Sequence, residues 1–237
     1  MVIAMTAVCV YSDGIGLMAG TITALEVQRN NKERVNVYLD GEFAFGLTML
    51  DAARLRKGQQ LTDAEIAALK STDSLQQAYE RAVRFLGQRP RSTAEVRHNL
   101  TDKEVDASVV EEVIARLEGQ GYLDDAAFAH YWITNRQQFR PRGARALRFE
   151  LREKGVPMPI IDEILAETDT TESAYQAALD KARRFRGLEK RAFREKLGAF
   201  LSRRGFDYDI VREVTDRLIN EFEEENADAF AQNDTEE

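Results

Sequence analysis

The fold of this chain is decided by residues 143–165, GARALRFELREKGVPMPIIDEIL, because related patterns occur once before and once after them. Residues 92–114 read STAEVRHNLTDKEVDASVVEEVI, and residues 193–215 read FREKLGAFLSRRGFDYDIVREVT. Four columns of apolar residues keep one register at offsets of 51 and then 50: Leu100, Leu151 and Leu201; Val105, Val156 and Phe206; Val109, Ile160 and Ile210; Val113, Ile164 and Val214. This periodicity predicts helical modules that bury their apolar faces against one another.

Each module is expected to contain three helices, so the predicted fold class is mainly α, with three tandem three-helix repeats in an elongated array. A small N-terminal domain of β-hairpins and short helices is expected to precede the array. We predict a poorly ordered leader at 1–19, the N-terminal domain at 20–73, the repeats at 74–123, 124–170 and 171–222, and an acidic disordered tail at 223–237.

The N-terminal domain is predicted to be a three-stranded meander, with strands at 22–28, 34–39 and 42–45. Asp40 and Gly41 supply the two positive-φ residues of a tight hairpin turn. Helical turns are expected at 48–55 and 62–70, where Thr62 and Glu65 form a capping box. The polar residues 71–74 predict a joint between this domain and the array.

Glycine marks the corner after the middle helix in two of the repeats. Lys154-Gly155 and Arg204-Gly205 are typical of a helix C-cap, where glycine accepts the left-handed conformation and the cation faces the helix dipole. The first repeat has Lys103-Glu104 at this place, so its corner is expected to be built differently.

Polar residues mark the starts of two helices. Ser92 is expected to cap the middle helix of the first repeat, with Glu95 reciprocating. Asp124 or Asp125 is expected to cap the helix that carries Phe128, because a carboxylate is favourable at the positive end of a helix.

Composition limits the class of protein. The chain has 237 residues and 43% apolar content, which is enough for a real core. A single cysteine, Cys9, argues against a disulfide framework and a zinc cluster, and favours a reducing cytoplasm. The opening residues are too short an apolar run to span a membrane and lack the basic start of a signal peptide. Met5 and Met18 both remain open as the true start.

The net charge of −8 does not by itself exclude nucleic acid as a partner. Residues 221–237 carry eight acidic residues and no basic one, so the rest of the chain is balanced. Within the repeats the balance becomes more basic toward the C-terminus. The tail reads equally well as a solubilising terminus or as a competitor for basic sites.

Nothing in the sequence predicts catalysis, a metal site or a cofactor. His98 and His130 lie in different repeats without a partner motif, and no phosphate-binding glycine loop follows a strand. Asp124 and Asp125 are adjacent but have no third carboxylate at ligand spacing. The glycines of residues 14–16 lack the flanking strand and helix of a dinucleotide site. The chain is therefore expected not to be an enzyme.

Basic residues are the stronger functional signal. Arg145, Arg148 and Arg152 share one helix face at spacings of three and four. Arginine in such a stripe suits carboxylate or phosphate, since its planar fork donates two parallel hydrogen bonds. A second basic cluster, which also includes Lys181 and Arg186, follows in the third repeat. The predicted partner-binding residues are Arg89, Arg91, Arg136, Arg140, Arg142, Arg145, Arg148, Arg152, Lys154, Arg183, Arg184, Lys190, Arg191 and Arg194. About half of the arginines read equally well as a solvated helix face balanced by local glutamates.

Four aromatic residues lie near the start of the second repeat: Tyr122, Phe128, Tyr131 and Trp132. Aromatic side chains can stack on the bases of single strands, but the helical spacing of these residues favours core packing. Tyr122 follows a turn glycine and is expected to be the most exposed of them.

An ordered set of residues resembles the RecX family of regulatory proteins. The set runs through Arg91, Ser92, Glu95, Leu117, Gly121, Tyr122, Leu123, Asp124, Asp125, Phe128, Ala129, Tyr131, Arg136, Gly143, Leu147, Glu150, Leu151, Lys154, Gly155, Val156, Ile160 and Ile164. The segment 34–41 also resembles an N-terminal extension found in some members. The third repeat departs from the pattern because it lacks the stretch that begins at Gly121.

The resemblance implies three tandem three-helix units and an activity of binding the RecA nucleoprotein filament and inhibiting its recombinase, ATPase and co-protease functions. It implies no catalytic residue. The expected partners are the RecA filament and, as a second candidate, single- or double-stranded DNA. No membrane is expected, and the protein is expected to be a cytoplasmic monomer. Direct DNA binding independent of RecA remains the alternative, and a helical adaptor for another protein is a third possibility.

Overall fold

The computed structural model describes residues 18–226 together with residues 229 and 230. The chain forms two compact units, one ending at Arg81 and the other beginning at Ala82. No helix in the described part has the length and apolar content needed to cross a bilayer. The predicted leader lies outside the described residues except for residues 18 and 19, which belong to a strand.

The first unit is built on an antiparallel sheet of four strands in the order β3-β2-β1-β4. The strands are β1 (Met18–Val27), β2 (Arg34–Leu39), β3 (Glu42–Thr48) and β4 (Gln60–Thr62), and a short helix, α1 (Met49–Ala52), follows β3. Ile22, Val37 and Leu47 are fully buried in the core of this unit. The predicted three-stranded meander was incomplete.

The missed strand, β4, pairs with β1 and places Leu61 opposite Gly20. Leu61 is buried, but it is the only apolar residue of a three-residue strand. Alternation of apolar and polar residues cannot reveal so short a strand. Thr62 also has the sequence features of a helix N-cap, so the sequence predicts it at the start of the following helix and not in a strand.

Two predicted local features of the first unit are confirmed. Asp40 and Gly41 adopt positive φ angles of 51° and 94° in the turn between β2 and β3. At the capping box the backbone N–H of Thr62 donates to the carboxylate of Glu65 at 2.8 Å, and the backbone N–H of Glu65 donates to the Thr62 hydroxyl at 3.3 Å. Both features depend on neighbouring residues alone, which is why the sequence predicts them.

The helix after β4, α2 (Asp63–Leu86), is continuous, so the predicted joint at residues 71–74 was wrong. Asp73, in the middle of that segment, is 6% exposed. Its carboxylate accepts hydrogen bonds from Arg34 of β2 at 2.8 Å and from Gln77 at 2.6 Å. Asp73 therefore attaches this part of the helix to the sheet of the first unit instead of ending the helix.

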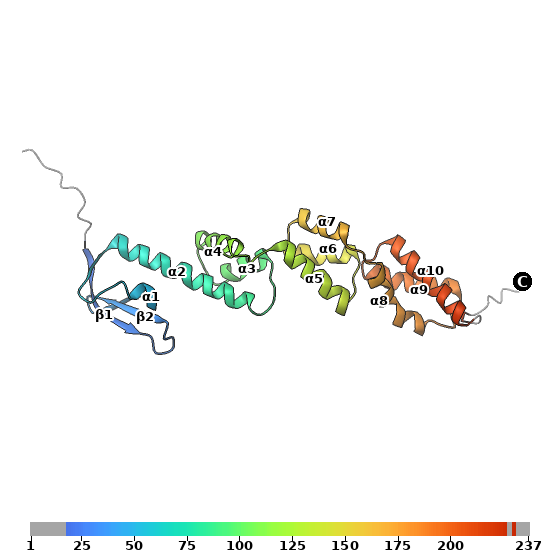
Figure 1. Ribbon diagram of the computed structural model, residues 1–237, viewed down its shortest axis with the longest axis horizontal. Helices are drawn as coiled ribbons and strands as arrows, with labels where there is room; N and C mark the ends of the chain where they lie inside the picture. The colour runs from blue at the N-terminus through green and yellow to red at the C-terminus, as the bar shows by residue number, and fades with distance from the viewer. Residues whose placement is uncertain (1–17, 227–228, 231–237) are drawn as a thin grey trace, which may run out of the picture. The chain divides into compact units, whose positions relative to one another are not determined.

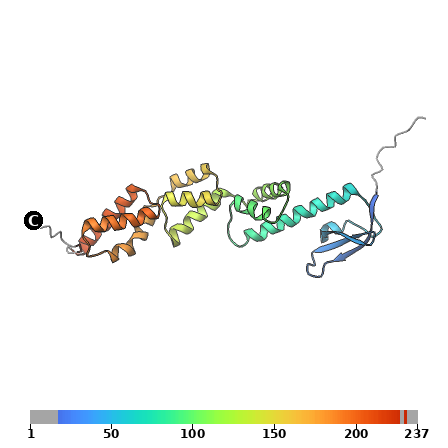
Figure 2. The same cartoon turned by 180° about the vertical axis from the view of Figure 1, so that it is seen from behind.

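The second unit contains three groups of helices, coloured green, yellow and red in Figures 1 and 2. Repeat 1 contains the end of α2 from Ala82, together with α3 (Thr93–Thr101) and α4 (Ala107–Gly119). Repeat 2 contains α5 (Asp125–Phe139), α6 (Ala144–Glu153) and α7 (Met158–Glu167), and repeat 3 contains α8 (Thr171–Arg184), α9 (Lys190–Arg203) and α10 (Tyr208–Glu225). Repeats 2 and 3 each bury their own apolar cluster. The predicted mainly helical fold with an N-terminal sheet is confirmed.

The corners that follow the middle helices α3, α6 and α9 share one backbone conformation. Gly155 and Gly205 have φ angles of 74° and 84°, as predicted, and Glu104 adopts the same left-handed region with a φ of 58°. The prediction that the first corner is built differently was therefore wrong. In each corner the next backbone N–H donates to a leucine carbonyl of the middle helix, at 3.1 to 3.4 Å. This shared bond holds Glu104 in a conformation that costs a non-glycine residue about 1–2 kcal/mol.

Repeat 3 extends into the segment predicted to be a disordered tail. The helix α10 continues to Glu225, and its Phe222 is buried. Beyond it, Phe230 is also buried and packs edge-on against Phe193, with ring centroids 5.1 Å apart. Acidic composition suggested disorder, but the apolar residues within the segment supply a packing face. Residues 231–237 lie outside the described part.

Candidate partner-binding surface

Most of the basic residues predicted to bind a partner are already paired with an acidic side chain of this chain. The pairs are Arg89 and Lys154 with Glu95, Arg136 and Arg142 with Glu150, Arg145 with Asp207, Arg148 with Asp162, Lys190 with Glu223, Arg191 with Glu195, and Arg194 with Asp216. To bind an acidic group of a partner, a paired cation has to give up its salt bridge with an acidic side chain of this chain. Its gain on binding a partner is correspondingly smaller.

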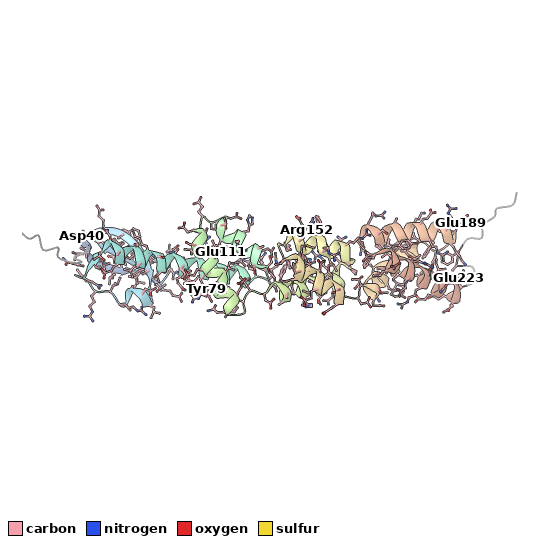
Figure 3. All side chains as sticks on the ribbon, turned by 90° about the horizontal axis from the view of Figure 1, so that it is seen from above. Asp40, Tyr79, Glu111, Arg152, Glu189 and Glu223 are labelled. Carbon is pink, nitrogen blue, oxygen red and sulfur yellow. The ribbon has the colours of Figure 1, made fainter. Side chains whose placement is uncertain are left out.

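The other predicted residues form no salt bridge within the described part of the chain: Arg91, Arg140, Arg152, Arg183 and Arg184. Arg91 stacks on the ring of Phe85 at 3.9 Å, and its Nε is buried, so its role is in packing. The remaining four arginines are exposed, and Arg152 is labelled on repeat 2 in Figure 3. These four are the candidates for direct contact with a partner.

The stripe on α6 is therefore less uniform than its spacing suggests. Arg145, Arg148 and Arg152 are all exposed, but each meets a different group. Arg148 donates to Asp162 of α7 at 2.9 Å, and Arg145 donates to the backbone carbonyl of Phe206 at 3.0 Å. Arg152 lies over the ring of Phe149 at 5.5 Å and forms no salt bridge with any residue that the structure describes.

Repeats 1 and 2 meet at a polar junction centred on Glu95. Its carboxylate accepts hydrogen bonds from Arg89 at 2.8 Å and from Lys154 at 3.0 Å. The predicted cap is confirmed in part: Ser92 accepts from the backbone N–H of Glu95 at 3.1 Å, while the Glu95 side chain turns to the two cations. The Ser92 hydroxyl also donates to the carbonyl of Lys154, which joins the start of α3 to the end of α6.

The electrostatics of Glu95 follow from this geometry. Burial opposes ionisation, but the hydrogen bonds and charges of Arg89 and Lys154 outweigh it and lower the pKa of Glu95 from 4.5 to about 2. The carboxylate is therefore ionised throughout the physiological range and holds the junction together.

We expect Glu95→Gln to lower the free energy of unfolding at pH 7 by about 2 kcal/mol, less than the full pKa shift because solvent partly screens the cluster. The folded-state pKa is about 2 and the reference value is 4.5, so the stabilisation is present above pH 4.5 and is lost as the pH falls toward 2. Urea unfolding of wild type and variant at pH 7 and pH 3 checks this. An equal difference at both pH values would contradict it.

Trp132 is enclosed by charged groups instead of presenting a free stacking face. Arg136 lies over its ring at 4.2 Å and Lys154 at 5.2 Å. Its indole N–H donates to Glu150 at 2.8 Å. Of the four aromatic residues singled out in the sequence, Tyr122 is the most exposed, at 62%, as predicted.

Repeats 2 and 3 meet through backbone groups. The backbone N–H of Gly143 donates to the carbonyl of Arg204 at 3.0 Å, and the N–H of Arg145 donates to the carbonyl of Gly205 at 3.2 Å. Backbone N–H groups at the N-terminal end of α6 thus donate to the carbonyls that follow α9. The first junction has the same arrangement, because the start of α3 meets the end of α6 there. Free N–H groups of one helix end satisfy free carbonyls of the other.

A cavity of about 450 Å³ lies beside this second junction, between α5, α8 and α9. Its lining includes Lys181, Arg184 and Arg204, with Phe200 between them and Asp180 as the acidic residue. The partner-binding prediction included Arg184 but missed Arg204, which the sequence marked only as a helix cap. The offset of 50 from Lys154 was the signal that could have found it.

The structure assigns local roles to the residues weighed as catalytic or metal-binding. Asp124 caps α5 by accepting from the backbone N–H groups of Ala126 at 2.8 Å and Ala127 at 3.0 Å, and Asp125 accepts from the backbone N–H of Thr93 at 2.8 Å. The two carboxylates therefore point to different partners. Within the described residues, no group of three potential ligands is placed to hold a metal ion.

Family models match the chain in four consecutive segments. The regulatory protein RecX N-terminal domain matches residues 20–62, and the first, second and third three-helix domains of RecX match residues 78–117, 124–165 and 167–215. The chain belongs to the RecX family. Its members are named regulatory proteins, and the matches follow the N-terminal sheet and the three repeats in order.

Similar relatives cover most of the chain. The regulatory protein RecX of Geobacillus thermodenitrificans is 33% identical over 89% of this chain and 82% of its own length, and that of Leuconostoc mesenteroides is 32% identical over 86% and 78%. A crystal structure of regulatory protein RecX aligns with a TM-score of 0.66 at 29% identity, covering 83% of this chain and 99% of that one. RecX from Lactobacillus salivarius shares the fold, with a TM-score of 0.59 at 21% identity, covering 63% of this chain and 99% of that one.

Proposed function

We propose that this chain is a non-enzymatic regulator that binds the RecA nucleoprotein filament and inhibits its recombinase, ATPase and co-protease activities. The observation that carries the proposal is the ordered match to all four domains of a family of regulatory proteins. The cytoplasm, where a recombinase filament assembles, is the proposed location, and the monomer is the proposed binding unit.

The distribution of uncompensated arginines supports a binding mechanism spread over the repeats. Arg140 and Arg152 belong to repeat 2, and Arg183 and Arg184 to repeat 3. Each exposed guanidinium offers a weak charge-assisted contact to a carboxylate. Contacts on linked repeats reinforce one another, because the first one formed raises the effective concentration of the next. A regulator bound to neighbouring filament subunits in this way would oppose filament growth and the subunit movements coupled to ATP hydrolysis.

The test is the single-strand-DNA-dependent ATPase of the cognate RecA, titrated with this protein. We expect inhibition at less than one regulator per recombinase subunit, with weak binding to the same DNA in the absence of RecA. Unchanged ATPase activity at a molar excess would contradict the proposal. A parallel titration of the DNA alone separates an effect on the filament from competition for DNA.

Direct DNA binding remains the alternative, and the same exposed arginines favour it, since a guanidinium also suits phosphate. It predicts binding without RecA that weakens steeply as salt rises. Removal of acidic residues is expected to strengthen such binding, but Phe222 and Phe230 are buried in repeat 3. The deletion should therefore begin at residue 231, which removes Asp234, Glu236 and Glu237 and spares the packed segment.

A further inference from the structure

The cavity beside the junction of repeats 2 and 3 collects positive charge around an aromatic floor. Lys181 lies over the ring of Phe200 at 5.9 Å, and Arg204 lies over the same ring at 4.6 Å. Arg184 completes the basic lining. None of the three cations forms an ion pair with an acidic side chain within residues 18–226. Asp180 is the one acidic residue of the lining, so the cavity carries an excess of positive charge.

Arg204 shows the consequence of this excess. Burial and the positive charge of Arg142 lower the pKa of Arg204, and among the described residues no carboxylate offsets them. Arg142 itself is turned toward Glu150, at 3.7 Å. A partly buried arginine held against a second cation, without a counter-charge, is more stable when an anion is bound.

Comparison of the two junctions identifies which charge is missing. The offsets of 51 and 50 place Ala146 at the position of Glu95, and Arg204 at the position of Lys154. At the first junction the Glu95 carboxylate lies 3.0 Å from Lys154 and neutralises it. The second junction has a methyl group in place of that carboxylate.

A second difference between the repeats also removes a carboxylate from the surroundings of Arg204. In repeat 2, Glu150 balances the cations around Trp132, accepting a hydrogen bond from Arg136 at 2.6 Å. The offset of 50 places Phe200 at the position of Glu150. Both carboxylates that balance the cations of the first junction and repeat 2 are thus absent from the corresponding positions around Arg204.

We propose that the cavity binds carboxylate side chains of an acidic protein segment, which supply the charge that Glu95 supplies at the first junction. A carboxylate is favoured because a glutamate occupies the corresponding place in this same architecture. The cavity volume of about 450 Å³ also admits a short stretch of peptide, and Gln137 and Gln138 of its lining can hydrogen-bond to peptide groups. The site goes beyond the proposed function; if its occupant belongs to the filament, that assignment rests on the proposed function.

The first part of the test introduces a carboxylate into the chain itself, at position 146. Ala146→Glu is expected to raise the midpoint of thermal unfolding by about 2–5 °C, because a new carboxylate neutralises Arg204. It is also expected to weaken binding of a fluorescein-labelled octaglutamate peptide at least about tenfold in a polarisation assay. Ala146→Gln, which has the same shape without the charge, should do neither. An Ala146→Glu protein that binds the peptide as tightly as wild type does would overturn the proposal.

The second part removes cations from the intact chain and does not depend on how well position 146 accepts a larger side chain. Lys181→Gln/Arg204→Gln should weaken peptide binding at least about tenfold. Arg97→Gln/Arg212→Gln loses the same charge outside the cavity, at side chains that pair with Glu111 and Asp216, and should change binding less than about twofold. Equal losses in the two double variants would show that the peptide responds to net charge alone and would overturn the site.

Two further measurements identify the class of molecule that binds in the cavity and test the site separately from the proposed regulation of RecA. An unlabelled 20-nucleotide oligo(dT) that displaces the peptide at a tenfold lower concentration than unlabelled octaglutamate would reassign the cavity to nucleic acid and overturn the proposal. The ATPase titration on the same variants reports the function separately. A protein that binds octaglutamate through the cavity but never inhibits RecA would keep the site and lose the proposed function.

Discussion

Alanine in place of Gly143 is expected to lower the free energy of unfolding by about 3 kcal/mol, by forcing repeats 2 and 3 apart. A Cβ atom at this position would lie 2.2 Å from the backbone nitrogen of Phe206 and 2.3 Å from the carbonyl oxygen of Gly205. Both are backbone atoms, so no rotamer change relieves the clash. The φ of Gly143 is −78°, which any residue adopts, so the whole effect arises from the close approach.

The measurement is urea denaturation followed by circular dichroism. In a repeat array, stability is the sum of the repeats and their interfaces, so damage at one interface should also broaden or split the transition. Gly198→Ala in α9 is the matched control, because its Cβ would meet Val211 at an ordinary 3.6 Å. That variant should gain up to about 1 kcal/mol from helix propensity. A Gly143→Ala protein with wild-type stability and a single sharp transition would disprove the proposed role of the close approach.

The sequence predicts the role of a glycine only where that role is set by neighbouring residues. Gly155 and Gly205 were predicted to be helix caps because a left-handed corner is a local requirement. Gly143 carries no local signal beyond its place in a repeated stretch. Its importance comes from Gly205 and Phe206, which are about 60 residues away along the chain, and no pattern of apolar residues encodes that distance.

The same limit applies to the binding surface. Spacing correctly placed Arg145, Arg148 and Arg152 on the exposed face of one helix. Whether each charge is available depends on acids supplied by other helices, such as Asp162 of α7 and Asp207 before α10. The repeat register predicts the fold because many apolar positions support it together, whereas each ion pair depends on a single contact.

Inhibition of the RecA ATPase is expected to require the uncompensated arginines more than the paired ones. Arg140→Gln/Arg152→Gln/Arg183→Gln should raise the concentration for half-maximal inhibition at least about tenfold, since three charge-assisted contacts are lost. None of these side chains has an acidic partner in the part of the chain that the structure describes, so the free energy of unfolding should change by less than about 0.5 kcal/mol.

The control removes the same number of charges from arginines that pair across helices within a repeat. Arg97 pairs with Glu111 at 2.8 Å, Arg148 with Asp162 at 2.9 Å and Arg194 with Asp216 at 3.0 Å. Each exposed pair contributes up to about 1 kcal/mol, so Arg97→Gln/Arg148→Gln/Arg194→Gln should lose stability and change inhibition less than about threefold. If inhibition weakens equally in the two triple variants, net charge governs binding and the distinction between paired and uncompensated arginines has no functional meaning. If inhibition weakens only in the triple variant of the uncompensated arginines, partner binding depends on the few arginines that the acidic residues of the repeats leave unpaired.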